Sequence, residues 1–177
     1  MKRAITVLLL IIVAASCGRD ESVPLRGTVT IDSRLYGPGP YYAFGFTFLT
    51  ASRTPTNRTP MPDILVLAET NVAGDVTGVF FSTTAFLPSF KLHGEYPDAA
   101  SAITAFNNLT EVSAAGNWLD LALPVEANEV WLFRTRDEKY AKIRIVEVKG
   151  ELREGIPYAE CTFEWTFQPD GSTSFPL

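Results

Sequence analysis

The sequence is poor in the side chains that form disulfides and bind transition metals. Its 177 residues include two cysteines, two methionines and one histidine. The cysteines are Cys17, which follows an apolar N-terminal segment, and Cys161. Two cysteines cannot build a disulfide framework, and with a single histidine they cannot supply the four ligands of a structural zinc site. We therefore expect Cys161 to act as a small buried apolar side chain.

Catalytic motifs are missing as well. The G-x-S-x-G elbow, the P-loop and the glycine pattern of dinucleotide-binding folds do not occur. A serine nucleophile would have His93 as its only imidazole base. The acids Asp63, Asp75, Glu95 and Asp98 are isolated, without the spacing of paired general acids and bases or of a calcium loop. We therefore expect a protein that is not an enzyme, with a hydrolase as the remaining alternative.

Only one long hydrophobic run stands out, and it lies at the N-terminus over residues 4–15. A helix of this length is roughly 18 Å long, whereas the hydrocarbon core of a bilayer is about 30 Å thick. Lys2 and Arg3 supply a positive charge directly before the run. The pattern predicts a signal peptide over residues 1–16 rather than a membrane-spanning helix.

The end of this segment resembles a bacterial lipobox. Ala14, Ala15 and Ser16 precede Cys17, although Ala14 stands where leucine is more usual. The resemblance implies that Cys17 carries a diacylglyceryl group and that residues 17–24 form a spacer. Two or more acyl chains hold a protein stably on a membrane. We expect an outer-membrane lipoprotein facing the cell surface or the periplasm; the alternative is a secreted protein in which Cys17 is incidental.

Positive charge is scarce relative to negative charge. The net charge is −5, with 15 basic and 20 acidic residues, and loss of residues 1–16 would remove two basic ones. An acidic surface argues against nucleic acid and against electrostatic docking on anionic lipid. The partners we expect are the membrane, through the anchor, and a small-molecule ligand.

Aromatic residues are plentiful, and their spacing favours strands. The 12 Phe, six Tyr and three Trp fit a β-rich chain. Apolar or alternating stretches predict strands, while Pro- and Gly-rich stretches predict a turn and a loop. The predicted strands are 25–31, 41–50, 63–69 as a buried central strand, and 77–84; the turn is 36–40 and the loop 51–62. One helix is predicted over 97–109, with Asp98 as its N-cap.

The C-terminal third has the clearest pattern. Residues 129–135 and 139–150 read as a β-hairpin around a polar turn, and 158–168 alternates strictly between apolar and polar side chains. That alternation places Cys161 on the inward face. Residues 25–177 are therefore predicted to form one mainly-β domain of antiparallel, sandwich-like sheets with one short helix.

This C-terminal region also resembles a known family. The Arg-Thr turn with Asp137, the run 139–142 (KYAK) and the tail 170–172 (DGS) are similar to the C-terminal hairpin and tail of HmuY-type lipoproteins, haem-binding proteins of Bacteroidetes. The likeness departs at 62–63, where the family usually has a tryptophan before the strand, and Asn71 matches its next turn only in part. The resemblance implies a β fold and haem capture.

Haem iron is held by His, Met, Cys or Tyr side chains. The predicted mature chain has one histidine, His93, and one methionine, Met61, so two histidines of one chain cannot hold the iron. His93 and Met61 are therefore the candidate haem ligands. Each also has a purely structural interpretation, as a histidine at a strand end and a methionine packed in a Pro-rich loop. The alternative function is a HmuY-like scaffold without haem that acts as an interaction lipoprotein.

Overall fold

The computed structural model describes residues 23–36 and 42–175. The expected signal peptide, Cys17 and most of the expected spacer and first turn lie outside the described residues. Within the described part of the chain, no helix combines the length and the apolar character needed to cross a bilayer.

Strands dominate the fold, and every strand pairing is antiparallel. This confirms the predicted fold class of antiparallel, sandwich-like sheets with one short helix. The elements are β1 (Arg26–Asp32), β2 (Phe44–Thr47), the 3₁₀ helix η1 (Phe48–Thr50), β3 (Ser52–Pro55), β4 (Leu65–Thr70), β5 (Val76–Ser82), β6 (Phe90–Glu95), α1 (Ala99–Asn108), β7 (Glu129–Arg134), β8 (Tyr140–Arg153) and β9 (Ile156–Gln168).

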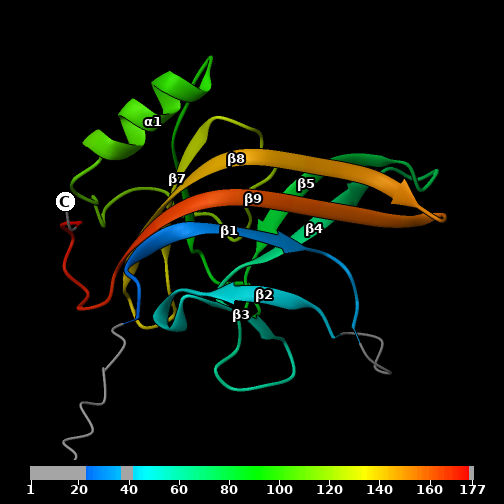
Figure 1. Ribbon diagram of the computed structural model, residues 1–177, viewed down its shortest axis with the longest axis horizontal. Helices are drawn as coiled ribbons and strands as arrows, with labels where there is room; N and C mark the ends of the chain where they lie inside the picture. The colour runs from blue at the N-terminus through cyan, green and yellow to red at the C-terminus, as the bar shows by residue number, and fades with distance from the viewer. Residues whose placement is uncertain (1–22, 37–41, 176–177) are drawn as a thin grey trace, which may run out of the picture.

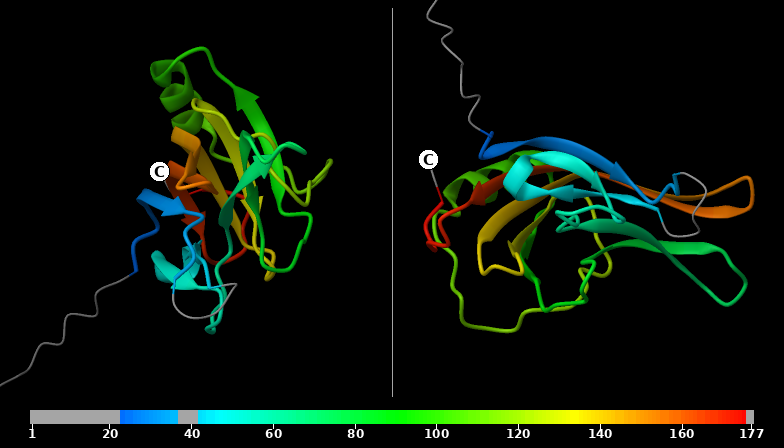
Figure 2. Two further views of the ribbon diagram at one scale, coloured as in Figure 1. Left: turned by 90° about the vertical axis from the view of Figure 1, so that its right-hand side faces the viewer. Right: turned by 90° about the horizontal axis from the view of Figure 1, so that it is seen from below.

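A five-stranded sheet in the order β1-β9-β8-β7-β6 forms the middle layer (Figure 1). The hairpins β2–β3 and β4–β5 form two small sheets that pack against one face, with β4 on β9 and β5 on β8. Helix α1 covers part of the opposite face, against β7 and β8, and Figure 2 shows it on the other side of the sheet from the small hairpins. The predicted hairpin of 129–135 with 139–150 is confirmed as β7–β8.

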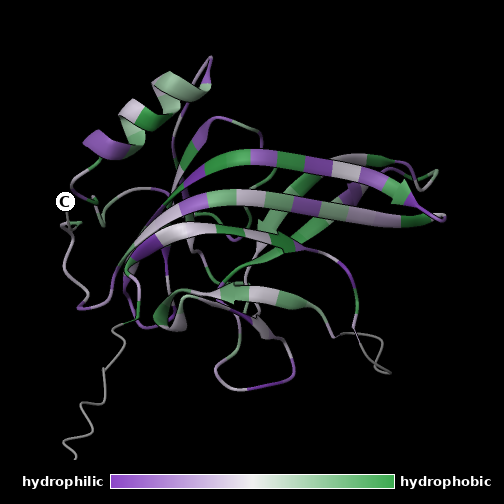
Figure 3. Ribbon diagram, in the orientation of Figure 1, coloured by the Kyte–Doolittle hydropathy of each residue, from purple (hydrophilic) through white to green (hydrophobic). Residues whose placement is uncertain are grey.

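The main core lies between the large sheet and the two hairpins. Alternate residues of β9 face this core, and Figure 3 shows the resulting alternation of apolar and polar positions along β8 and β9. Phe163 packs edge-on against Phe46, and Phe167 stacks on Phe48 with ring centroids 5.6 Å apart. Cys161 is fully buried there, as predicted, and burial raises the pKa of its thiol.

A second, smaller core lies under α1. Asp98 caps the helix as predicted, because its Oδ1 accepts the backbone N–H of Ser101 at 2.7 Å. At the other end, the ammonium of Lys142 on β8 donates to the carbonyls of Phe106 at 2.7 Å and Leu109 at 2.9 Å. These carbonyls lack helical partners, so Lys142 fastens the last turn of α1 to the sheet.

Two predicted segments differ from the structure. The single strand expected over 41–50 ends at Thr47 and turns into η1, which closes at Ala51 with a left-handed φ of 47°. The expected loop 51–62 then contains the short strand β3, which pairs with β2. The chain therefore doubles back here, and Phe46 and Phe48 enter the core from a bend rather than along one strand.

The segment 63–69 was expected to be a buried central strand, and this is wrong. It leads into β4, which pairs with β5 in a two-stranded sheet. Ile64, just before β4, is fully buried and forms an isolated bridge to Phe46, and within β4 Val66 is buried while its neighbours stay partly exposed. The segment is apolar because one of its faces packs on β9. Strand β6 was also not resolved as a separate strand from the sequence, because a register shift between Leu92 and Gly94 breaks its alternation.

Gly45 lies where β2 approaches the start of β4 most closely. A Cβ added at Gly45 would overlap the carbonyl oxygen of Ile64 and would lie 2.6 Å from Cβ of Pro62. We expect Gly45→Ala to lower the free energy of unfolding by about 1–3 kcal/mol, because backbone must move to admit the methyl group. Urea denaturation measures the change. Gly27→Ala is the control, since its Cβ would meet the Trp165 ring at 3.4 Å; an equal loss in both variants would contradict the explanation.

Candidate functional site

A cavity of about 300 Å³ lies at the end of the sandwich where three connecting segments meet. The segments are the Pro-rich loop 59–63, the loop 83–89 and the β7–β8 turn at 135–139. We call it the Met61 cavity. Phe133 and Phe167, from the core face of the sheet, and Leu49 and Leu87 provide apolar wall, and Met61 lies in the Pro-rich segment.

Hydrogen bonds fix the segments that surround the cavity. The backbone N–H of Asp63 donates to the carbonyl of Phe46 at 2.9 Å, and its carboxylate accepts the backbone N–H of Phe48 at 2.9 Å. On the other side, the N–H of Thr135 donates to the Lys139 carbonyl at 2.8 Å, and its hydroxyl accepts the N–H of Lys139. The Pro-rich loop and the hairpin turn are thereby held as two opposing walls.

The cavity contains both signs of charge. The pKa of Asp63 is raised to about 6, mainly by burial; the Phe48 N–H opposes the shift, Asp137 adds to it and Lys139 opposes it. Arg136 and Lys139 also line the cavity. Within the described residues, neither of these cations forms an ion pair, and Asp63 has none either. The site therefore combines an apolar wall, two cations, the carboxyl of Asp63, which is costly to ionise, and the carboxyl of Asp137 in the hairpin turn.

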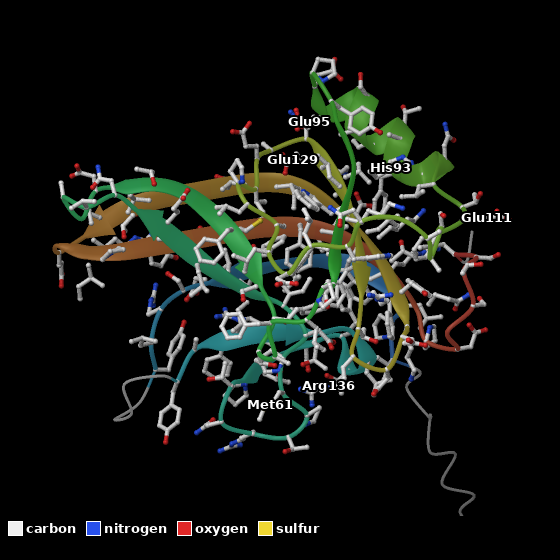
Figure 4. The ribbon with its side chains drawn as sticks, turned by 180° about the vertical axis from the view of Figure 1, so that it is seen from behind. Met61, His93, Glu95, Glu111, Glu129 and Arg136 are labelled. Carbon is white, nitrogen blue, oxygen red and sulfur yellow. The ribbon has the colours of Figure 1, made fainter. Side chains whose placement is uncertain are left out.

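The two predicted haem ligands lie in different places. Met61 is 54% exposed and lines the cavity, whereas His93 does not line it. His93 is exposed on β6 at the register shift between Leu92 and Gly94, where partial burial and the neighbouring Lys91 lower its pKa. Figure 4 shows Met61 beside Arg136 at one end of the domain and His93 near α1. The structure therefore does not bring the two candidates together at one cavity.

A buried acid near His93 has a structural explanation. Glu129 is 5% exposed, and its Oε2 accepts the indole N–H of Trp131 at 2.7 Å and the backbone N–H of Glu126 at 2.9 Å. Burial raises its pKa, and the nearby Glu95 adds to the shift. These bonds hold the loop before β7 against the sheet. Among the described residues, no group of three or more His, Cys, Asp or Glu side chains is arranged to hold a metal ion.

Sequence reasoning missed the cations and aromatics of the cavity. Arg136 was predicted as part of a polar turn and Lys139 as the first residue of the following strand, while Phe133 and Phe167 were predicted as strand residues. No local pattern indicates that the Pro-rich loop lies opposite that turn, because some 70 residues separate them. Of the residues that line the cavity, Met61 was predicted as a ligand-binding residue, because methionine is rare in this sequence.

Comparison with known proteins provides no relative from which to transfer a function. No family model matches this chain, and no curated protein is significantly similar to it. The resemblance to HmuY-type lipoproteins therefore stays a prediction, and the function has to be argued from the site.

The raised pKa of Asp63 leads to a test by pH. Because the folded pKa of about 6 lies above the ordinary 3.8, the folded state binds the proton more tightly than the unfolded chain. Ionisation therefore lowers stability as pH rises from about 4 to about 6, and the full loss of about 2–3 kcal/mol holds above that window. We expect Asp63→Asn, which keeps an acceptor for the Phe48 N–H, to raise the free energy of unfolding at pH 8 by about 1–3 kcal/mol.

Urea denaturation between pH 4 and pH 8 measures this effect. The exposed Asp120 provides the matched control, and Asp120→Asn should leave the profile unchanged. A wild-type profile that rises through the same window, or that Asp63→Asn does not flatten, contradicts the assignment.

Proposed function

We propose that this protein is a lipid-anchored binding protein of the bacterial outer membrane whose Met61 cavity captures a small amphipathic organic acid. Haem is the ligand that the HmuY resemblance implies. The observation that carries the proposal is the joint presence of an apolar wall and two unpaired cations in one cavity. A cavity of about 300 Å³ is at the lower end of the range for small-molecule sites.

The chemistry of the walls fits an amphipathic acid. Leu49 and Leu87 offer apolar surface to an apolar body beside the buried rings of Phe133 and Phe167, and Arg136 and Lys139 offer donors to its carboxylates. Arginine and lysine differ here in geometry, because the guanidinium can donate two parallel bonds to one carboxylate. The raised pKa of Asp63 makes its carboxyl easier to protonate beside a bound anion than that of an ordinary aspartate.

The lining of this cavity would offer haem one axial ligand, and its volume of about 300 Å³ would admit part of the macrocycle rather than all of it. The thioether of Met61 is an established type of haem ligand, and the cations suit the two propionates. No histidine, cysteine or tyrosine lines the cavity, so a second axial protein ligand is not offered there. A bound haem would supply the iron, and the chain would supply the thioether, the apolar contact and the counter-charges.

A haemin titration followed by absorption tests the proposal. We expect the Soret band to shift on binding to the wild type at micromolar haemin. Met61→Leu, which keeps the apolar volume but removes the sulfur, should weaken binding about tenfold and change the shifted spectrum, a loss of about 1.4 kcal/mol. Arg136→Gln should weaken binding about two- to fivefold, because exposed charge pairs contribute up to about 1 kcal/mol.

His93→Ala is the matched control for the ligand assignment. His93 lies outside the cavity, so this variant should bind haemin as the wild type does. A spectrum that changes with His93→Ala and not with Met61→Leu would move the iron site to β6. The absence of any Soret shift would end the haem version of the proposal.

A second candidate function is that of an interaction lipoprotein without haem. It is favoured by exposed apolar side chains at the far ends of two hairpins: Val72 between β4 and β5, and Leu152 and Ile156 at the β8–β9 end. Val72 is fully exposed and Ile156 is 68% exposed. Figure 1 shows both hairpin ends projecting on the same side of the molecule. Absence of haemin binding would favour this candidate.

The proposed anchor has its own test. We expect Cys17→Ala to move the protein from the membrane fraction to the soluble fraction, because no thiol remains to take the diacylglyceryl group. Fractionation followed by immunoblotting measures the distribution. A Cys161→Ala variant controls for loss of a cysteine elsewhere and should stay in the membrane fraction. Retention of Cys17→Ala in the membrane fraction would show that the anchor assignment is wrong.

A further inference from the structure

A second cavity lies on the opposite face of the large sheet from the Met61 cavity. It has a volume of about 440 Å³ and is lined by the last turn of α1, by β1, β8 and β9, and by Phe175 near the C-terminus. The C-terminal segment is held there, because the N–H of Phe175 donates to the Thr110 carbonyl at 2.9 Å and the N–H of Val112 to the Thr173 carbonyl at 2.7 Å. We call it the Lys142 cavity.

The strand register places two cations in one row across its floor. Thr166 of β9 is the direct partner of Arg26 on β1 and of Lys142 on β8. Directly opposed residues project from the same face of a sheet, a few ångströms apart. Arg26, Thr166 and Lys142 therefore form a row of guanidinium, hydroxyl and ammonium. All three line the cavity.

The row has no carboxylate of its own. Glu164 also lines the cavity, but it belongs to the next row and is paired with Arg144, whose two guanidinium nitrogens lie 2.8 and 2.9 Å from Glu164 Oε2. Arg26 is exposed and forms no ion pair within the described residues. Its guanidinium is therefore free to meet a ligand at the mouth of the cavity.

Lys142 is a buried cation with neutral partners. It is 5% exposed, and its ammonium donates to two main-chain carbonyls, which leaves a third N–H. Burial lowers its pKa, and the nearby Glu164, whose ion pair is with Arg144, offsets this only in part. A buried charge without an ion-pair partner is costly, so an anion in the cavity would be stabilised by Lys142 and would stabilise it in return.

Two aromatic rings complete the cavity. The Lys142 ammonium lies 4.7 Å from the ring centroid of Phe106 and 5.4 Å from that of Phe175. Both rings are almost fully buried and line the cavity beside the charged row. An apolar group that enters would therefore contact ring surface while its charged end reaches the row.

We propose that the Lys142 cavity binds a small aromatic carboxylate, with the carboxylate on the Arg26–Thr166–Lys142 row and the ring against Phe106 and Phe175. The row supplies one guanidinium, one hydroxyl and one ammonium to the carboxylate, which is a charge-assisted set of donors. This site is separate from the Met61 cavity, since the large sheet lies between them, and it does not depend on haem binding.

Isothermal titration calorimetry of the purified full chain with naphthoate tests the proposal, and naphthamide serves as the uncharged counterpart. We expect saturable binding of naphthoate and at least about tenfold weaker binding of naphthamide, because charge-assisted hydrogen bonds contribute about 1.5–3 kcal/mol. Arg26→Gln should weaken naphthoate about two- to fivefold and leave naphthamide unchanged. Lys142→Met should weaken naphthoate further, by about tenfold or more.

Two matched variants locate the binding. Arg34→Gln removes an exposed arginine just past the other end of β1 and should bind naphthoate as the wild type does. Because the Met61 cavity is itself proposed to take an organic acid, Arg26→Gln is also measured in an Arg136→Gln background, where it should weaken naphthoate by the same factor. Circular dichroism checks the fold of Lys142→Met, and if that variant unfolds, Arg26→Gln carries the test. Absence of saturation, equal affinity for the two probes, or a loss in Arg136→Gln without one in Arg26→Gln would overturn the proposal.

Discussion

The alternation of side chains along β8 and β9 determines which residues of the large sheet face the main core and which face α1. In β9, Cys161, Phe163, Trp165 and Phe167 fill the main core, while the residues between them face the side of α1. A slip of one residue would exchange these two faces entirely. Thirteen paired positions, from Tyr140↔Gln168 to Arg153↔Ile156, fix the register with one shift on the way. The hairpin therefore determines what each of the two faces can hold.

The same alternation separates the two cavities. Phe167 and Phe133 lie on the core face and reach the Met61 cavity, whereas Lys142 and Thr166 lie on the helix face and reach the Lys142 cavity. The β7–β8 turn lies only a few residues before Lys142 in the chain. The same hairpin therefore supplies Arg136 from its turn to the Met61 cavity and Lys142 from its strand to the Lys142 cavity. Each face of the sheet thus borders a cavity that is lined by aromatic residues and two cations. The two cavities use neighbouring strand positions, whose side chains project from opposite faces of the sheet.

A feature of this structure could be predicted from the sequence when it depends on residues that lie close together in the chain. The β7–β8 hairpin, strand β9, the helix with its Asp98 cap and the inward Cys161 depend on short-range patterns, and all are confirmed. The central position expected for 63–69 depends on which strands pair. An apolar run predicts a strand but does not indicate which strands lie beside it. The cavities depend on contacts between distant segments. For the same reason, the rarity of Met61 and His93 identified them as candidate haem ligands but did not predict that they lie apart in the fold.

Electrostatics then limits what such sites select. The chain has a net charge of −5, yet at physiological salt the field of distant charges is screened beyond about 8 Å. A small anion that enters a cavity therefore experiences Arg136 and Lys139, or Arg26 and Lys142, more strongly than the overall charge. A polyanion has to extend across the acidic surface and meets repulsion over most of its length. The selection that we propose for the two cavities rests on this combination of local charge and apolar contact, and it would favour compact anions with an apolar body.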